Sequence, residues 1–226
     1  MKRYIKCGRQ YNAEKAFSVD PNVRAKYAST IKNVELLEIY SHDPVPYVRE
    51  CVANNPATPL DVLRQMIEDP TNGFFVLREL ARNPNTPVDG LKRLVQLERG
   101  DHVDLKMCIA SNPSAPADLL SELSKISFMP LHRAIVYNRN TPPDIIDKLV
   151  KNDPYDVRGA AADNPNTRSE TLAFIFDNTS EAQMDYRFLR SLARNPNTPV
   201  DLLNRLVKDT YLKDLVEANP SYRGIV

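Results

Sequence analysis

Residues 195–206 read NPNTPVDLLNRL, and this stretch decides the fold because most of it recurs along the chain. A close copy, NPNTPVDGLKRL, begins at Asn83. A short motif that returns at a nearly constant interval is typical of stacked repeats, in which each copy belongs to one supersecondary unit. The sequence therefore predicts a repeat protein. Weaker copies of the motif begin at Asn55, Asn112, Asn138 and Asn164.

The repeats can be aligned on the asparagine that opens the motif, with Asn219 as the seventh copy. Successive asparagines are 28, 29, 26, 26, 31 and 24 residues apart, which indicates loops of different length within a constant unit. A degenerate first repeat begins at Asp20, where DPNVRAKY resembles DPVPYVRE at Asp43. We therefore expect an N-terminal cap or arm in residues 1–19 and an array of about seven and a half repeats in residues 20–226.

Apolar periodicity predicts a first helix before each asparagine. The positions seven and three residues before it are apolar in all seven copies, as at Val48 and Val52. A separation of four residues places such a pair on one helical face. A small alanine recurs two residues before the asparagine, as at Ala53, and allows a neighbouring helix to approach closely.

A second helix is predicted to begin at the threonine three residues after the asparagine. In the copy at residues 195–206, Thr198 is followed by Pro199 and, three residues after the threonine, by Asp201. This order resembles a capping box with proline at the first helical position, so we expect the threonines to be N-caps. The leucines that follow need a partner surface, and stacking of neighbouring repeats supplies it.

Composition places the chain among soluble proteins of a reducing compartment. The 30 basic and 29 acidic side chains give a net charge of +1, so no overall field favours nucleic acid or an anionic membrane. No apolar run approaches the roughly 20 residues that a membrane span needs, and the N-terminus lacks the apolar segment of a signal peptide. Three cysteines, an odd number, fit a cytoplasmic protein better than a disulfide scaffold.

The combined pattern VR…VA.NP.TP…L..L, seen between Val48 and Met66, resembles the variant leucine-rich repeat family. The resemblance covers roughly residues 20–221. It implies a right-handed superhelix of short helices in which α and 3-10 segments alternate. HEAT-like α/α arrays are the neighbouring possibility. One member of the family carries an iron–sulfur cluster in a cysteine-rich N-terminal segment, but this N-terminus holds only Cys7, so no such cluster is expected.

No catalytic or metal-binding pattern stands out from the repeats. The three histidines are scattered, and the chain has neither a Cys-x-x-Cys nor a glycine-rich phosphate loop. The acids that follow the threonines fit helix capping rather than acid–base chemistry. We therefore expect a protein that is not an enzyme and that uses no cofactor.

A column of basic residues is the single pattern that packing alone does not require. Most of its members lie six residues before the asparagine, and two lie five residues before it. In a solenoid, equivalent positions form a ladder along one face. This basic ladder comprises Arg24, Arg49, Arg78, Lys106, His132, Arg158, Arg190 and Lys213.

Three interpretations of the basic ladder stay open at this point. An arginine beside a buried position can lay its stem on the core and pair with an acid of the next repeat. Alternatively, the ladder binds an acidic peptide or protein, or it follows a phosphate backbone, although no aromatic residues interleave with it for base stacking. We predict an all-α solenoid that acts as a protein-interaction scaffold, with a nucleic-acid-backbone-binding solenoid as the alternative.

Overall fold

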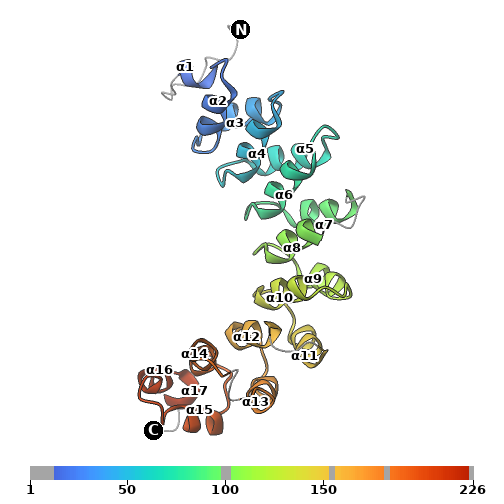
Figure 1. Ribbon diagram of the computed structural model, residues 1–226. Coiled ribbons are helices and arrows are strands. Elements are labelled where there is room, and N and C mark those ends of the chain that lie inside the picture. The colour runs from blue at the N-terminus through green and yellow to red at the C-terminus, as the bar shows by residue number, and fades with distance from the viewer. Residues whose placement is uncertain (1–12, 98–102, 153–155, 181–183, 224–226) are drawn as a thin grey trace. The chain divides into compact units, whose positions relative to one another are not determined.

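A computed structural model shows helical repeats and describes residues 13–97, 103–152, 156–180 and 184–223. It divides into two compact units, Met1–Gly100 (unit 1) and Asp101–Val226 (unit 2). Within each unit short α-helices follow one another in pairs, and the described residues contain no strand (Figure 1). The predicted all-α solenoid of short helical repeats is confirmed. Both helices of the repeats are α-helices, which is the α/α form.

In its described residues, unit 1 contains three helix pairs that follow a short helix, α1 (Ala13–Ala16). The first helices of its pairs are α2 (Pro21–Ala28), α4 (Pro46–Asn54) and α6 (Phe74–Arg82). The second helices are α3 (Val34–Ser41), α5 (Leu60–Glu68) and α7 (Val88–Leu97).

Unit 2 continues the same alternation in five helix pairs. Its first helices are α8 (Val103–Ser111), α10 (Met129–Tyr137), α12 (Asp156–Asp163), α14 (Tyr186–Arg194) and α16 (Lys213–Glu217). Its second helices are α9 (Ala117–Leu123), α11 (Pro143–Asn152), α13 (Ser169–Asp177), α15 (Val200–Leu206) and α17 (Pro220–Arg223).

The helices of each unit form two rows, one of first helices and one of second helices (Figure 1). In unit 1, α4 packs between α2 and α6, and in unit 2, α10 packs between α8 and α12. Contacts within the row of first helices are more extensive than contacts within the other row. The recurrent alanine explains the difference, because Ala53, Ala81 and Ala162 are fully buried where neighbouring first helices meet.

The predicted apolar positions form the core. Val48 and Val52 are fully buried, as are the equivalent Leu131 and Ile135 in unit 2. The leucine of the second helix, such as Leu63, is also fully buried. Burial of apolar side chains between stacked repeats is therefore the main stabilising contribution in both units.

The asparagine of the motif links each repeat to the one before it. Its Oδ1 accepts a hydrogen bond from the amide two residues later, as from Ala57 to Asn55, at 2.8 Å. Its Nδ2 donates to two backbone carbonyls of the preceding repeat. These donations run from Asn55 to Ala28 and Ile31, from Asn83 to Ala53 and Asn55, from Asn138 to Ala110 and Asn112, from Asn164 to Val136 and Asn138, from Asn195 to Ala162 and Asn164, and from Asn219 to Ala193 and Asn195.

The prediction that the threonines are N-caps of the second helices is wrong. The hydroxyl of Thr198 instead donates to the carbonyl of Leu192, at 2.6 Å, and so satisfies the end of the first helix. Helix α15 begins at Val200 after an N-cap at Pro199 that makes no side-chain cap bond. The proline therefore lies one position earlier than expected. Thr58, Thr86, Thr141 and Thr167 donate in the same way as Thr198.

The N-terminal segment is described only from Ala13 onward. Helix α1 contacts α2, and the hydroxyl of Tyr40 donates to the carbonyl of Ala16 at 2.7 Å. Burial raises the pKa of Tyr40 to about 12, so the phenol stays protonated as this bond requires. The part of the predicted cap or arm in residues 1–12 lies outside the described residues.

Candidate functional site

Several members of the basic ladder form hydrogen bonds with loop residues. In unit 1, Arg24 forms a two-bond ion pair with Asp43, at 2.7 and 3.0 Å, and donates to the carbonyl of Ser18. Arg49 is buried and donates to the carbonyl of Asp43 and to Oδ1 of Asn72, both at 2.7 Å. These two guanidinium groups donate hydrogen bonds to a backbone carbonyl of the loop that precedes their own helix. Their role is therefore structural.

The same arrangement recurs in unit 2. Nε2 of His132 donates to the carbonyl of Ile126, at 2.7 Å, and the acceptor again lies six residues earlier in the chain. Arg158 donates from Nη1 to the carbonyl of Asn178, at 2.7 Å. Arg24, Arg49, His132 and Arg158 therefore each donate to a loop carbonyl, and for Arg158 this loop follows the helix pair rather than preceding it.

The remaining ladder residues do not share one environment. Arg78 pairs with Glu79 at 3.0 Å and lies over the ring of Phe75, and Lys106 is half-buried. Only Arg190 and Lys213, among the eight residues, are exposed. Lys213 lies 3.8 Å from Glu217 on its own helix. The predicted ladder residues thus differ in burial and partners, and Arg190 is the exposed member that belongs to a larger cluster.

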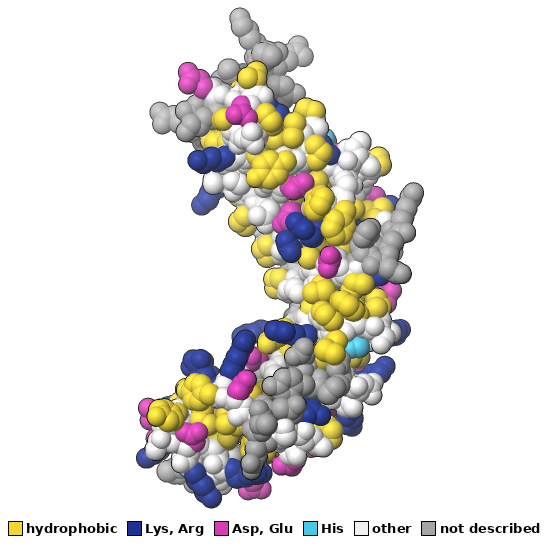
Figure 2. Space-filling model, viewed as in Figure 1, with side chains coloured by type: hydrophobic (Ala, Val, Ile, Leu, Met, Phe, Trp, Pro, Cys, Tyr) yellow, Lys and Arg dark blue, Asp and Glu magenta, His cyan; other side chains and the backbone are white. Residues whose placement is uncertain are grey.

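That cluster covers the exposed side of α10, α12 and α14, and we call it the arginine face. Arg187, Arg190 and Arg194 follow one another at helical spacing on α14, opposite the buried Phe188 and Leu192. Arg133 extends the cluster on α10 and is also exposed. Figure 2 shows Lys and Arg side chains gathered over this part of unit 2. The arginine face therefore comprises Arg133, Arg187, Arg190 and Arg194.

The arginine face offers charge that folding does not use. Within the described residues, no hydrogen bond or ion pair engages the guanidinium groups of Arg187, Arg190 and Arg194. Arg133 lies over the ring of Tyr137, at 5.7 Å from the centroid, and makes no described ion pair. Since arginine binds carboxylate and phosphate oxygens through paired N–H groups, these side chains are suited to an anionic partner.

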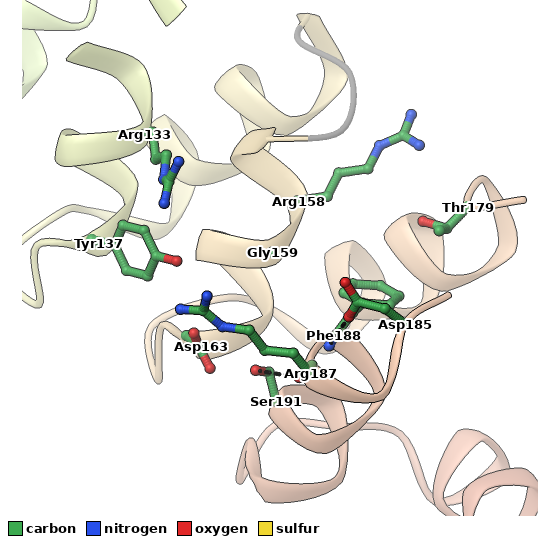
Figure 3. A pocket seen from close by; sticks show the side chains of 10 residues that line it. All are labelled: Arg133, Tyr137, Arg158, Gly159, Asp163, Thr179, Asp185, Arg187, Phe188 and Ser191. Carbon is green, nitrogen blue, oxygen red and sulfur yellow. Dashed lines mark hydrogen bonds between the residues drawn. The ribbon is translucent and has the colours of Figure 1, made fainter. Parts of the chain in front are cut away.

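A hollow of about 170 Å³ lies in the arginine face. Arg133 and Tyr137 from α10 and Arg187 from α14 extend over α12 at Gly159, while Arg158 points away from them (Figure 3). The backbone of Gly159 is open to this space, since an added Cβ would meet no atom within 4 Å. Asp163 and Asp185 also line the hollow.

Sequence reasoning missed three of the four arginines and the hollow. The available signal was the repeat of Arg187, Arg190 and Arg194 on the side of α14 that faces away from its apolar positions. A second signal was Gly159, five residues before Asn164, where the other aligned repeats carry a longer side chain. Neither signal shows by itself that α10 and α14 bring their side chains over α12.

The equivalent face of unit 1 has a different character. Tyr47 on α4 and Phe75 on α6 occupy the same repeat position, and their side chains are 55% and 57% exposed. Burial and the nearby Glu79 raise the pKa of Glu50. Burial, followed by the charges of Glu50 and Glu79, raises the pKa of the Cys51 thiol, which disfavours its reactive thiolate.

The described residues provide no arrangement for a metal or a membrane. Among them, no three His, Cys, Asp or Glu side chains come together as a set of metal ligands. None of the helices in the described ranges has the length and apolar character to cross a bilayer. Cys51 and Cys108 are both free thiols, and Cys108 is buried.

No protein-family model matches the chain, and no curated protein matches it.

Proposed function

We propose that the protein is a non-enzymatic repeat scaffold that binds an acidic segment of a partner protein on the arginine face of unit 2. One observation carries the proposal: four arginines gather on α10 and α14 without a described ion pair, although acids are available elsewhere in the unit. Arg24 and Arg49 show that this chain satisfies its arginines where it needs them for folding. Charge left unpaired over neighbouring helices is typical of a binding surface.

The repeat architecture supports a preformed face. The first helices of unit 2 are linked by the asparagine bonds, for example from Asn164 to the carbonyls of Val136 and Asn138. A rigid stack holds side chains of successive helices at fixed separations, so an extended partner loses less entropy on binding than it would with a flexible loop. The resemblance to the variant leucine-rich repeat family supports a scaffold of this kind and stays a proposal.

An acidic protein segment fits the face better than a nucleic-acid backbone, the alternative function. Asp163 and Asp185 lie among the arginines of the hollow, and Asp214 is exposed on α16. A continuous phosphate track would pass close to these carboxylates, and like charges weaken such binding. A peptide can place its acids opposite the arginines and neutral residues opposite the aspartates. The free thiols of Cys51 and Cys108 support a cytoplasmic location for this scaffold.

The proposal is tested by selecting displayed random 12-residue peptides on the intact chain. We expect enriched peptides to contain Asp or Glu and to bind the variant with Arg187→Glu and Arg190→Glu at least tenfold more weakly. The matched control reverses Lys148 and Lys151, two exposed charges on α11, and should keep the affinity. Oligouridine and duplex DNA serve as the nucleic-acid arm, in which binding that falls steeply with salt would favour the alternative function.

Two results would overturn the scaffold proposal. One is enrichment of peptides without acidic residues. The other is equal binding to the wild-type chain and to the Arg187→Glu/Arg190→Glu variant, provided that both chains unfold at the same urea concentration.

A further inference from the structure

We propose that the hollow over Gly159 is a subsite for one carboxylate side chain, an Asp or Glu of the bound segment. This inference rests on the proposed function and adds the chemistry of one recognised residue. Arg133 and Arg187 of the arginine face line the hollow together with the phenol of Tyr137 and the open backbone of Gly159.

The hollow exists because one repeat lacks a side chain. Gly159 lies five residues before the asparagine of its repeat, on the exposed side of α12. Helix interiors disfavour glycine relative to alanine, and the structure shows no close packing that would demand it here. A binding role accounts for a glycine that folding does not need. The equivalent residues in the other repeats are Glu50, Arg78, Met107, Arg133, Arg190 and Asp214.

The lining suits a carboxylate. Arg133 and Arg187 approach the space over Gly159 from the two flanking helices, and Tyr137 adds a hydroxyl donor (Figure 3). The contact between Arg133 and the ring of Tyr137 restrains both side chains before a ligand arrives. Two guanidinium groups around one small anion give charge-assisted hydrogen bonds, which are stronger than neutral ones.

Charge and size favour a carboxylate over a phosphoryl group. Three arginines and two aspartates line the hollow, but Arg158 points away from it, so the charges that face the ligand balance (Figure 3). Arg158 is directed to the carbonyl of Asn178, so Arg133 and Arg187 face the ligand opposite Asp163 and Asp185. A carboxylate carries one charge, whereas a phosphorylated side chain carries about 1.5 to 2 and would be repelled more strongly by the aspartates. A volume of about 170 Å³ admits one short side chain.

The decisive variant is Gly159→Met, which fills the hollow from below. A Cβ added at Gly159 meets no atom within 4 Å, and Met107 already occupies the equivalent position on α8. The variant should therefore fold at least as stably as the wild-type chain. We expect it to bind acidic peptides at least tenfold more weakly, since the methionine side chain prevents one carboxylate of the peptide from reaching Arg133 and Arg187. Met is neutral, so loss of affinity cannot come from a change in net charge.

The probe is a blocked pentapeptide with one glutamate, Ac-Ala-Ala-Glu-Ala-Ala-amide, added to the ¹⁵N-labelled chain. The chain has six glycines, so the Gly159 amide is readily assigned as the reporter. We expect the Glu peptide to shift this amide, the Gln counterpart to leave it unmoved, and the phosphoserine counterpart to bind more weakly than Glu. Arg187→Gln and Arg133→Gln should each reduce the affinity about tenfold.

The outcomes separate this subsite from the scaffold as a whole. The subsite is wrong if displayed acidic peptides bind through Arg190 and Arg194 while Gly159→Met binds them normally and the Gly159 amide does not move. A phosphoserine peptide that binds more tightly than the Glu peptide would overturn the choice of carboxylate. If the Glu peptide shifts the Gly159 amide but the display enriches no acidic sequence, the subsite stands and the scaffold proposal fails.

Discussion

Unit 1 and unit 2 share their internal bonding and differ on the exposed side of their first helices. In unit 1, the arginines Arg24, Arg49 and Arg78 are engaged by Asp43, Asn72 and Glu79, respectively. The exposed residues there include the aromatic Tyr47 and Phe75. In unit 2 the corresponding side carries the unpaired arginines of the arginine face. Figure 2 shows the basic side chains gathered over part of unit 2.

The contrast shows which repeat positions build the scaffold and which are free to vary. The asparagine and the threonine keep their partners in both units, as Asn55 and Asn164 illustrate. A basic residue six positions before the asparagine donates a hydrogen bond to a loop carbonyl in both units, as Arg49 and His132 show. The position eight residues before it is exposed at Tyr47, Phe75 and Arg187, and the position five residues before it ranges from half-buried to exposed, so both can change without cost to the core. The proposed binding face accordingly uses those variable positions.

The largest expected effect comes from breaking what the units share. Asn164→Ala removes the donor to two buried carbonyls, those of Val136 and Asn138, and should cost about 3 kcal/mol of unfolding free energy. Asn55→Ala should cost a similar amount in unit 1. Urea denaturation followed by circular dichroism measures both. Asn164→Asp keeps the Oδ1 acceptor but loses the donor, so a stable Asp variant would refute the inter-repeat role.

The next effect belongs to unit 1 alone. Asp43→Asn removes the charged partner of Arg24 in a pair whose side chains are only 15% and 6% exposed. We expect a loss of about 2–3 kcal/mol, because the guanidinium stays partly buried without its counterion. Asp61→Asn is the matched control, since its carboxylate is 90% exposed and lies 3.6 Å from Arg64. Equal urea midpoints for the two variants would show that burial does not distinguish these pairs.

Two glycines in helix interiors, one in each unit, sharpen the comparison. Gly159→Ala should stabilise the chain by about 0.5–1 kcal/mol, because the added Cβ enters open space. The free energy of unfolding of Gly90→Ala should be about 1 kcal/mol lower than that of Gly159→Ala, because the Cβ added at Gly90 would lie 2.8 Å from Cδ1 of the buried Ile67. Thermal unfolding of both variants gives the difference. The same gain in both would mean that Ile67 moves aside freely.

The smallest effect is a pH dependence in unit 1. The raised pKa of Glu50 means that the folded chain binds this proton more tightly than the unfolded chain, whose value is near 4.5. Stability is then lost as the pH rises above that value, so Glu50→Gln should raise the Tm slightly at pH 7 and not at pH 4.

Asp69 provides the opposite sign as the control for Glu50. Its hydrogen bonds with Thr71 lower the pKa of this carboxyl, and this contribution is present at pH 7 and disappears as acid protonates the group. Asp69→Asn should therefore lower the Tm at pH 7. The explanation fails if the Glu50 and Asp69 variants change the Tm in the same direction.

Much of the fold was predictable because its signals are local and repeated. The apolar pairs such as Val48 and Val52 share a helical face whatever surrounds them, and seven copies reinforce the pattern. The hydroxyl of Thr198 could either accept from the amides of α15 or donate to a carbonyl of α14. Its role was misassigned because both groups lie within a few residues of it in sequence. Only the path of the turn determines that its hydroxyl faces the carbonyl of Leu192 rather than the amides of α15.

The binding face was less predictable than the fold. Conserved spacing drew attention to the basic residues six positions before the asparagine, but repetition marks what every repeat needs for folding. Arg49 and His132 accordingly bond to their own loops. Arg133 and Arg187 lie in different repeats at different positions, so no sequence period connects them.

The sequence by itself determined a stack of short helix pairs, because the period of apolar residues and the recurrent asparagine specify each repeat locally. Tertiary structure alone decided which polar groups are hydrogen-bonded within the stack and which remain available to a partner. Hydrogen bonds such as that from Asn195 to the carbonyl of Asn164 join residues that are far apart in sequence. The hollow over Gly159 likewise depends on two neighbouring helices, and its lining becomes a surface only when the repeats are packed side by side.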